Sequence, residues 1–358
     1  MTGATPPARR SGIGHLLGAR RVRVGPGLGA RGTGVVLGAL LVAFAVTGPW
    51  LAPNSPNEQF AGAVYAPPMR PHIIGRAGVR PPFVYPLRLE NRLEHRYVED
   101  RTHPMPLRLF QDGVLLSVDP AHGSPWFPLG ADALGRDQFA RLAWGTRLSL
   151  GVALGAALGA LVIGAIVGGL AGFAGGLVDD GLMRMADVVM ALPGVYVVLA
   201  LRASMPLVLT TTEVFWTMVV VLATVGWPFP ARGVRAVVAA ERAREYAEAA
   251  RALGASRTRL LLRHLLPAAR GFLVVQTTLL VPAFVLAEAT LSFVGLGFSE
   301  PIPSWGGMLR EAGSGRAIVD APWLLAPAVA IVLSALAVNL TAGAGSEPLL
   351  AARSDRSR

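Results

Sequence analysis

Six apolar segments, each long enough to cross a lipid bilayer, constrain this chain more than any other feature of its sequence. A membrane-spanning helix needs about 20 mostly apolar residues. Inside lipid every backbone polar group must be satisfied within the protein, and a helix does this within one segment. The six segments cover residues 34–52, 148–173, 185–203, 214–231, 272–297 and 322–340. We therefore predict an all-α membrane protein with six transmembrane helices.

The composition agrees with a membrane protein and argues against several other classes. Hydrophobic residues make up 53% of the 358 residues and charged residues only 15%, whereas soluble domains carry about 25% charged residues. The chain has no cysteine, so it can form neither a disulfide nor a thiolate metal site. It also has no lysine, and a conventional P-loop needs one. We expect a protein that is not an enzyme and that binds no metal or cofactor.

Basic residues predict the orientation in the membrane. The segment 1–33 carries several arginines and no acidic residue, and the segment 232–270 carries nine arginines against three glutamates. Cytoplasmic loops are enriched in such residues, which also explains the net charge of +11 without nucleic acid. No A-x-A-like cleavage site follows the first apolar run, so a signal peptide is disfavoured. We expect a multi-pass protein of the inner membrane with both termini, 1–33 and 341–358, in the cytoplasm.

Residues 53–140 form the one long segment that is predicted to lie outside the cell membrane. Proline is frequent there, and Asp112-Gly113 lies between two short apolar runs of 106–118. Such a pair is a strong signal for a β-hairpin. We predict a small β-rich extracytoplasmic insert before the five-helix core of 141–340. The histidines of this segment do not have the spacing of metal ligands: His72, His95, His103 and His122.

The second apolar segment carries two glycine tracks with four-residue spacing. The residues are Gly151, Gly155 and Gly159, followed by Gly164, Gly168 and Gly172. Small residues at this spacing let the backbones of neighbouring membrane helices approach closely. The pattern therefore predicts tight helix packing along this segment.

The charged stretch 241–267 is unexpected between two apolar segments, and it has the pattern of a helical hairpin. Gly254 is placed to end a first helix in the left-handed conformation, Ser256 to cap a second helix, and Pro267 to end or kink it. On the first helix, Arg244 and Arg251 are within one turn of Glu248, which predicts local ion pairs. The helix also carries an acidic stripe and a small-residue stripe: Glu241, Glu245 and Glu248, and Ala243, Ala247 and Ala250.

Two interpretations of this hairpin follow from the residues alone. Its small-residue face can sit in a groove of another protein, or its arginines can hold an amphipathic helix on anionic lipid. Glu248-Ala249-Ala250, then Gly254, then His264 to Pro267 resemble the EAA loop of permeases from ABC importers. His264 stands where the general pattern has isoleucine, as in the peptide and nickel branch of these importers.

Other segments extend the resemblance to the C-type subunit of the dipeptide/oligopeptide/nickel permease family. They lie within most of 128–340, at 128–150, 173–194, 286–297, 303–312 and 321–340, whereas the end of the chain departs from the family pattern. The resemblance implies a second permease subunit, two ATPase subunits that bind ATP and Mg²⁺, and an extracytoplasmic solute-binding protein. It assigns ATPase coupling to the hairpin and, by position, to Glu245, Glu248, Ala249, Ala250, Gly254, His264 and Pro267.

The cargo implied by the resemblance is a di- or oligopeptide, and a nickel complex or another small solute is the alternative. A secondary transporter that works without ATP is a less favoured class, because the sequence shows no inverted repeat of the kind such transporters contain. The insert either contacts the solute-binding protein or passively covers the first span.

Ionisable residues inside the membrane are candidates for the transport pathway. Glu288 lies in the fifth apolar segment, where it either lines the pathway, pairs across helices, or sits near the outer interface. Arg184 and Asp187 are one turn apart at the start of the third segment, which predicts a local pair.

Overall fold

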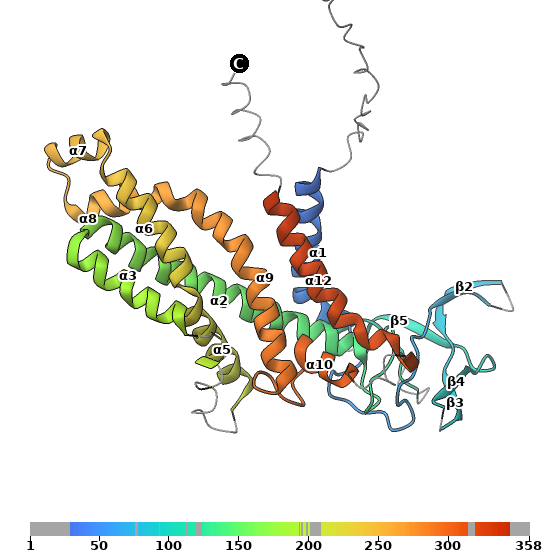
Figure 1. The fold of residues 1–358 in the computed structure, drawn as a ribbon. Helices are drawn as coiled ribbons and strands as arrows, with labels where there is room; N and C mark the ends of the chain where they lie inside the picture. The colour runs from blue at the N-terminus through green and yellow to red at the C-terminus, as the bar shows by residue number, and fades with distance from the viewer. Residues whose placement is uncertain are drawn as a thin grey trace, which may run out of the picture.

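The computed structural model describes residues 29–343 except 76–77, 93, 112, 119–123, 193, 195, 198–199, 201–208 and 314–318 (Figure 1). Predictions for most of 1–33 and of 341–358, and part of the third apolar segment, fall outside these residues. The described part is mostly helical, and its strands are confined to the first third of the chain. This agrees with a helical membrane protein that carries a separate insert.

Four helices in the described part are long and apolar enough to cross a membrane. They are α1 (Ala30–Leu51), α2 (Gln138–Ala174), the continuous helix Arg257–Val294, which includes α9 (Arg270–Val294), and Pro322–Thr341, which includes most of α12 (Ala326–Gly343). A fifth span is available if the bent pair α5 and α6 counts as one. The third predicted segment begins in α3 (Gly176–Ala191) and continues among residues that are only partly described. The count of six spans therefore stays a prediction.

The end of the fourth segment differs from its prediction. α5 (Thr211–Gly226) is followed at once by α6 (Pro228–Arg242), with a bend of 47° between them. Pro228 lacks a backbone N–H and is tolerated only in the first turn of a helix, so a new helix axis starts there. The chain consequently remains helical to Arg242 instead of becoming a loop after residue 231.

α2 is the central helix of the bundle, and it packs along α1, α5, α6 and α9. Gly168 shows how closely α6 approaches, because a Cβ atom at this position would lie 2.9 Å from the carbonyl carbon of Ala231. Such a separation is shorter than a carbon–carbon contact of about 3.5–4.0 Å. The glycine track therefore permits a helix contact that any side chain would prevent, as the sequence predicts.

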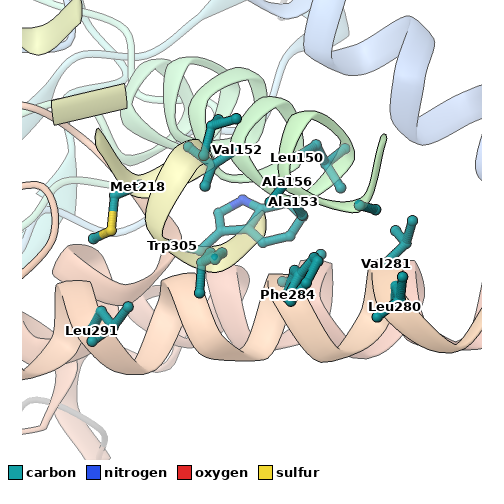
Figure 2. Packing of buried hydrophobic residues seen from close by; sticks show 14 of the residues in the cluster. Leu150, Val152, Ala153, Ala156, Met218, Leu280, Val281, Phe284, Leu291 and Trp305 are labelled. Carbon is teal, nitrogen blue, oxygen red and sulfur yellow. The ribbon is translucent and has the colours of Figure 1, made fainter. Parts of the chain in front are cut away.

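A buried tryptophan fixes the short helix α10 (Trp305–Ala312) between α2 and α9. Figure 2 shows the Trp305 ring beside Ala153 and Ala156 of α2 and Phe284 of α9. Its indole Nε1 donates a hydrogen bond of 3.1 Å to Thr146, so the polar atom of this large ring is satisfied inside the core. α10 is thereby held against both long helices.

The insert consists of strands that surround a small core of their own. A four-stranded antiparallel sheet has the order β1 (His72–Gly75), β2 (Gly78–Val84), β5 (Met105–Gln111) and β6 (Val114–Val118). β3 (Leu87–Asn91) and β4 (Arg96–Glu99) form a separate pair. Met69, Val84, Met105 and Phe127 are buried together in this core.

We predict that Gly168→Ala destabilises the protein, because the added methyl group forces α2 and α6 apart. Overpacking of this kind costs about 1–3 kcal/mol. Gly181→Ala in α3 is the matched control, since a Cβ there meets nothing within 4 Å and helix propensity favours alanine by up to about 1 kcal/mol. Thermal unfolding of both variants in detergent measures the difference. Equal midpoints for the two variants would show that the contact between α2 and α6 accommodates the added methyl group without loss of stability.

Candidate functional site

The segment that joins α6 to α9 forms a protruding helical hairpin, seen at the upper left of Figure 1. Its first helix is α7 (Glu245–Ala252) and its second begins with α8 (Arg257–Leu260). Gly254 between them has φ +85°, a left-handed conformation that glycine adopts without steric cost. The Ser256 hydroxyl accepts a hydrogen bond of 3.3 Å from the backbone N–H of Arg259 and so caps α8. Local sequence alone is sufficient to explain this turn.

The small-residue face of α7 points toward the protein itself. Ala247 is completely buried in a cluster with Val234 and Val238 of α6 and with Leu260 and Leu265 beyond the turn. The prediction that Ala243, Ala247 and Ala250 form one outward stripe is therefore wrong. The reason is that α6 ends at Arg242, so Ala243 lies before α7, while the two other alanines let α7 pack closely on its own chain.

The opposite face of α7 is exposed and lies next to the glycine turn. Glu245, Glu248, Ala249 and Ala252 are exposed there, and Leu253 has 89% of its surface accessible. Leu253 therefore adds one exposed apolar side chain at the tip of the hairpin. α7 thus presents a face with two carboxylates and an apolar end, on a base fixed to the bundle.

The arginines of the hairpin do not make the predicted pairs with Glu248. Arg244 pairs with Glu241 at 3.1 Å, and Arg251 donates to the carbonyl oxygens of Ala247 and Arg242 at 3.3 and 2.8 Å. The break between α6 and α7 turns the chain so that Arg251 reaches back to carbonyls at the end of α6. Glu248 is left exposed as a result.

Pro267 does not end the second helix of the hairpin. A π-type turn (Leu261–Leu265) and a 3-10 turn (Leu266–Ala269) lead directly into α9, and Pro267 lies at the start of the 3-10 turn. Proline lacks a backbone N–H, and its position coincides with this irregular stretch of the otherwise continuous helix. His264 is exposed in the π-type turn. The second helix therefore connects α7 to a membrane-spanning helix without a loop.

The Glu288 side chain lies in the interior of the helix bundle and is not exposed to solvent. It is fully buried in α9, and the Ser292 hydroxyl donates a hydrogen bond of 2.8 Å to its Oε1 atom. Ser292 belongs to the same helix one turn later, whereas Ser149, whose side chain also interacts with the Glu288 carboxylate, belongs to α2. The other carboxylate oxygen, Oε2, is buried without a hydrogen-bond partner among the described residues. In this chain alone, Glu288 is thus a buried core residue.

Asp187 pairs with Arg232 of α6 and not with Arg184, so the predicted local pair is wrong. A second pair in the same place joins Asp179 of α3 to Arg235 of α6, with Oδ1 and Nε 2.9 Å apart. Both aspartates face α6 because α3 packs along it. Two ion pairs therefore join α3 to the helix that carries the hairpin.

A buried network of charges lies at the start of α2, and our sequence analysis did not identify it. Arg136 and Arg141 are almost fully buried. Arg136 contacts Asp132 at 2.7 Å and Glu300 at 2.5 Å, and it also pairs with Glu311 of α10. Arg141 pairs with Glu300 at 2.9 Å. The network ties the loop before α2 to the connection between α9 and α10.

The network contains more carboxylates than guanidinium groups, and this excess of negative charge affects the pKa values of its glutamates. Three carboxylates, Asp132, Glu300 and Glu311, face two guanidinium groups. Burial raises the pKa of Glu311 to about 7, and the charges of Asp132 and Glu300 add to this effect. Burial acts against ionisation of Glu300 as well, but Arg141 and Arg136 hold its pKa below the ordinary value. One proton can therefore reside on Glu311 near neutral pH.

The described residues contain no group of three or more histidines, aspartates or glutamates arranged to hold a metal ion. The described residues instead contain two distinct features, one at each end of the bundle. A hairpin with one anchored and one exposed face stands at one end of the bundle, and an ionic network fixes the other end. Together with helices of membrane-spanning length, these features indicate an integral membrane protein.

Comparison with known proteins identifies the family. Residues 160–344 match the family described as binding-protein-dependent transport system inner membrane component, and the chain belongs to this family. The match covers the end of α2, then α3, α5 to α12 and the entire hairpin.

Individual relatives agree with this assignment. The chain is 40% identical over 215 residues to a putative peptide permease protein of Brucella ovis, which covers 60% of this chain and 68% of the relative. It is 37% identical over 228 residues to the oligopeptide transport system permease protein OppC of Bacillus subtilis, covering 63% and 72%. It is 32% identical over 309 residues to the di/tripeptide transport system permease protein DppC of Pseudomonas aeruginosa, which covers 86% of this chain and 83% of the relative.

We predict that Arg141→Gln destabilises the protein, because it leaves three carboxylates of the network facing the guanidinium group of Arg136 alone. Removal of one partner from a buried pair costs about 3–5 kcal/mol, and the lower end applies here because Glu300 is partly exposed to solvent. Arg147→Gln on the same helix is the control, since Arg147 is exposed. Denaturation in detergent compares the two. A loss of stability in both variants, or in neither, would contradict a specific role of the network.

Proposed function

We propose that this chain is one of two different permease subunits of an ATP-driven importer, and that it forms half of the translocation pathway for di- or oligopeptides. Family membership supports the permease role. The named relatives, which include oligopeptide and di/tripeptide permease proteins, support the choice of peptides. In this proposal the chain binds no cofactor, and separate ATP-binding cassette subunits bind ATP and Mg²⁺.

The proposal includes a topology with six spans and both termini in the cytoplasm. The third span then uses the end of α3 and the residues that follow it, and the bent pair α5–α6 provides the fourth. The hairpin lies on the cytoplasmic side and the insert outside. We propose that the insert lies at the outer mouth and contacts the solute-binding protein, and that lipid surrounds the remaining helices.

Two faces of one short helix carry the proposal for the hairpin. Ala247 fixes α7 to α6 and to the helix that leads into α9, while Glu248, Ala249 and Leu253 remain exposed. A groove of an ATPase subunit would receive the exposed face. Movement of that groove would then be transmitted through packed side chains to α6 and α9, both of which continue into the bundle.

The first test is cross-linking from single cysteines, which the absence of native cysteine makes direct. A cysteine-reactive photo-cross-linker at Ala249→Cys should capture an ATPase subunit in the assembled transporter, and ATP should change the yield. Ala247→Cys is the matched control on the same helix, because its side chain faces the core and should give no product. Capture from Ala247→Cys but not from Ala249→Cys would reverse the proposed faces. No capture from either position would exclude docking through α7.

Gly254 provides a second test of the same proposal. At φ +85° a side chain costs roughly 1–2 kcal/mol, and a β-branched residue is least tolerated. Gly254→Val should therefore uncouple ATP hydrolysis from peptide uptake while the chain still inserts into the membrane. Gly254→Asn is the control, since asparagine adopts this conformation more readily. Reconstituted transporter with normal peptide-stimulated hydrolysis in Gly254→Val would contradict the coupling role of the turn.

A further inference from the structure

A cavity of about 450 Å³ lies between the end of α2 and the hairpin. We call it the arginine cavity, because Arg242, Arg251 and Arg257 line it together with Phe173, Ala174 and Leu260. Its volume is within the roughly 300–1,000 Å³ of small-molecule sites. Neither the family assignment nor the proposed coupling role gives this cavity a purpose.

Neutral groups hold two of the three guanidinium groups in place. Arg242 donates from Nη1 to the carbonyl oxygen of Ala174 at 3.2 Å, and its Cζ atom lies 6.0 Å from the centre of the Phe173 ring. Arg251 donates to the carbonyl oxygens of Ala247 and Arg242. These contacts orient the charges without neutralising them.

Other arginines near the cavity form ion pairs with carboxylates. Arg235 is paired with Asp179, and Arg244 with Glu241. By contrast, no ion pair joins Arg242, Arg251 or Arg257 to a carboxylate within the described ranges of the chain. Three like charges that share one cavity repel one another. An anion bound among the three guanidinium groups would offset this repulsion.

We propose that the arginine cavity is a phosphate-binding site, filled by the headgroup of an anionic phospholipid. Guanidinium groups match phosphate because they donate two parallel, charge-assisted hydrogen bonds to its oxygen atoms. Basic pockets between transmembrane helices on the cytoplasmic side are a known kind of headgroup site. The proposed side of the hairpin is consistent with this kind of site.

The surroundings of the cavity favour a lipid over a soluble phosphate. Phe173 and Ala174 end α2, so in the proposed topology the cavity opens where this helix leaves the apolar layer. Leu170 before this end, and Leu177 and Val178 after it, are exposed apolar side chains. They continue the apolar surface of α2 and can accompany an acyl chain. A bound lipid would then join α2 to the hairpin, whether or not an ATPase docks on α7.

The test measures binding of three probes to the purified full-length chain by native mass spectrometry. The probes are phosphatidylglycerol, diacylglycerol with the same acyl chains, and glycerol phosphate. Arg257→Gln is the variant, because the Arg257 side chain forms no ion pair or hydrogen bond with any of the described residues. Arg259→Gln is the matched control: it removes the same charge from the same helix but does not line the cavity.

We expect phosphatidylglycerol to bind at least about ten-fold more weakly to Arg257→Gln, the loss expected for one charge-assisted hydrogen bond. Arg259→Gln should bind it like the unmodified chain, and diacylglycerol should not bind. Equal weakening by both variants, equal binding of diacylglycerol, or no binding of phosphatidylglycerol would each overturn the proposal. If glycerol phosphate binds as tightly as the lipid, with the same dependence on Arg257, the phosphate site stands and its source is soluble.

Discussion

Close contact between α2 and α6 is the interaction on which the rest of the structure depends. Lipid is as apolar as a leucine side chain, so membrane helices associate through van der Waals packing and not through the hydrophobic effect. Gly168 allows the α6 backbone near Ala231 to approach closer than a Cβ atom would permit. Because α6 leads into α7, and α3 is paired to α6 through Asp179 and Asp187, this contact sets the position of the hairpin.

The same helix, α2, organises the opposite end of the molecule through polar interactions. Arg136 just before α2, and Arg141 within it, join the loop that precedes the helix to Glu300 and Glu311. Trp305 then packs between α2 and α9 with its indole N–H satisfied by Thr146 (Figure 2). With 37 residues, α2 is about 55 Å long. It therefore connects the ionic network at one end of the bundle to the hairpin at the other end, through one continuous helix.

The proposed role of the hairpin as a connector rests on the difference between its two faces. Buried contacts of Ala247 with α6 and with Leu260 and Leu265 make α7 part of the bundle, whereas Leu253 and Glu248 on the other face are exposed. The helix is continuous from α8 into α9. A displacement of the hairpin would therefore be transmitted directly to the membrane-spanning helix. The arginine cavity lies on the same connection, so a bound phosphate would stiffen it at the membrane surface.

Local patterns in the sequence determined the helical membrane character, the close packing along the glycine track, and the turn built from Gly254 and Ser256. Each depends on hydropathy, spacing or backbone preference within a few residues, which a single sequence displays. The partners of charged and small side chains were decided only by tertiary structure. Asp187 pairs with Arg232 and not with Arg184. Arg251 donates to backbone carbonyls and does not pair with Glu248, and Ala247 is buried. Each of these contacts depends on the direction of α6 and on how α7 packs against it. The network of Arg136 and Arg141 required the same knowledge, because its carboxylates Glu300 and Glu311 are distant in sequence and meet the arginines only after α9 and α10 have packed on α2.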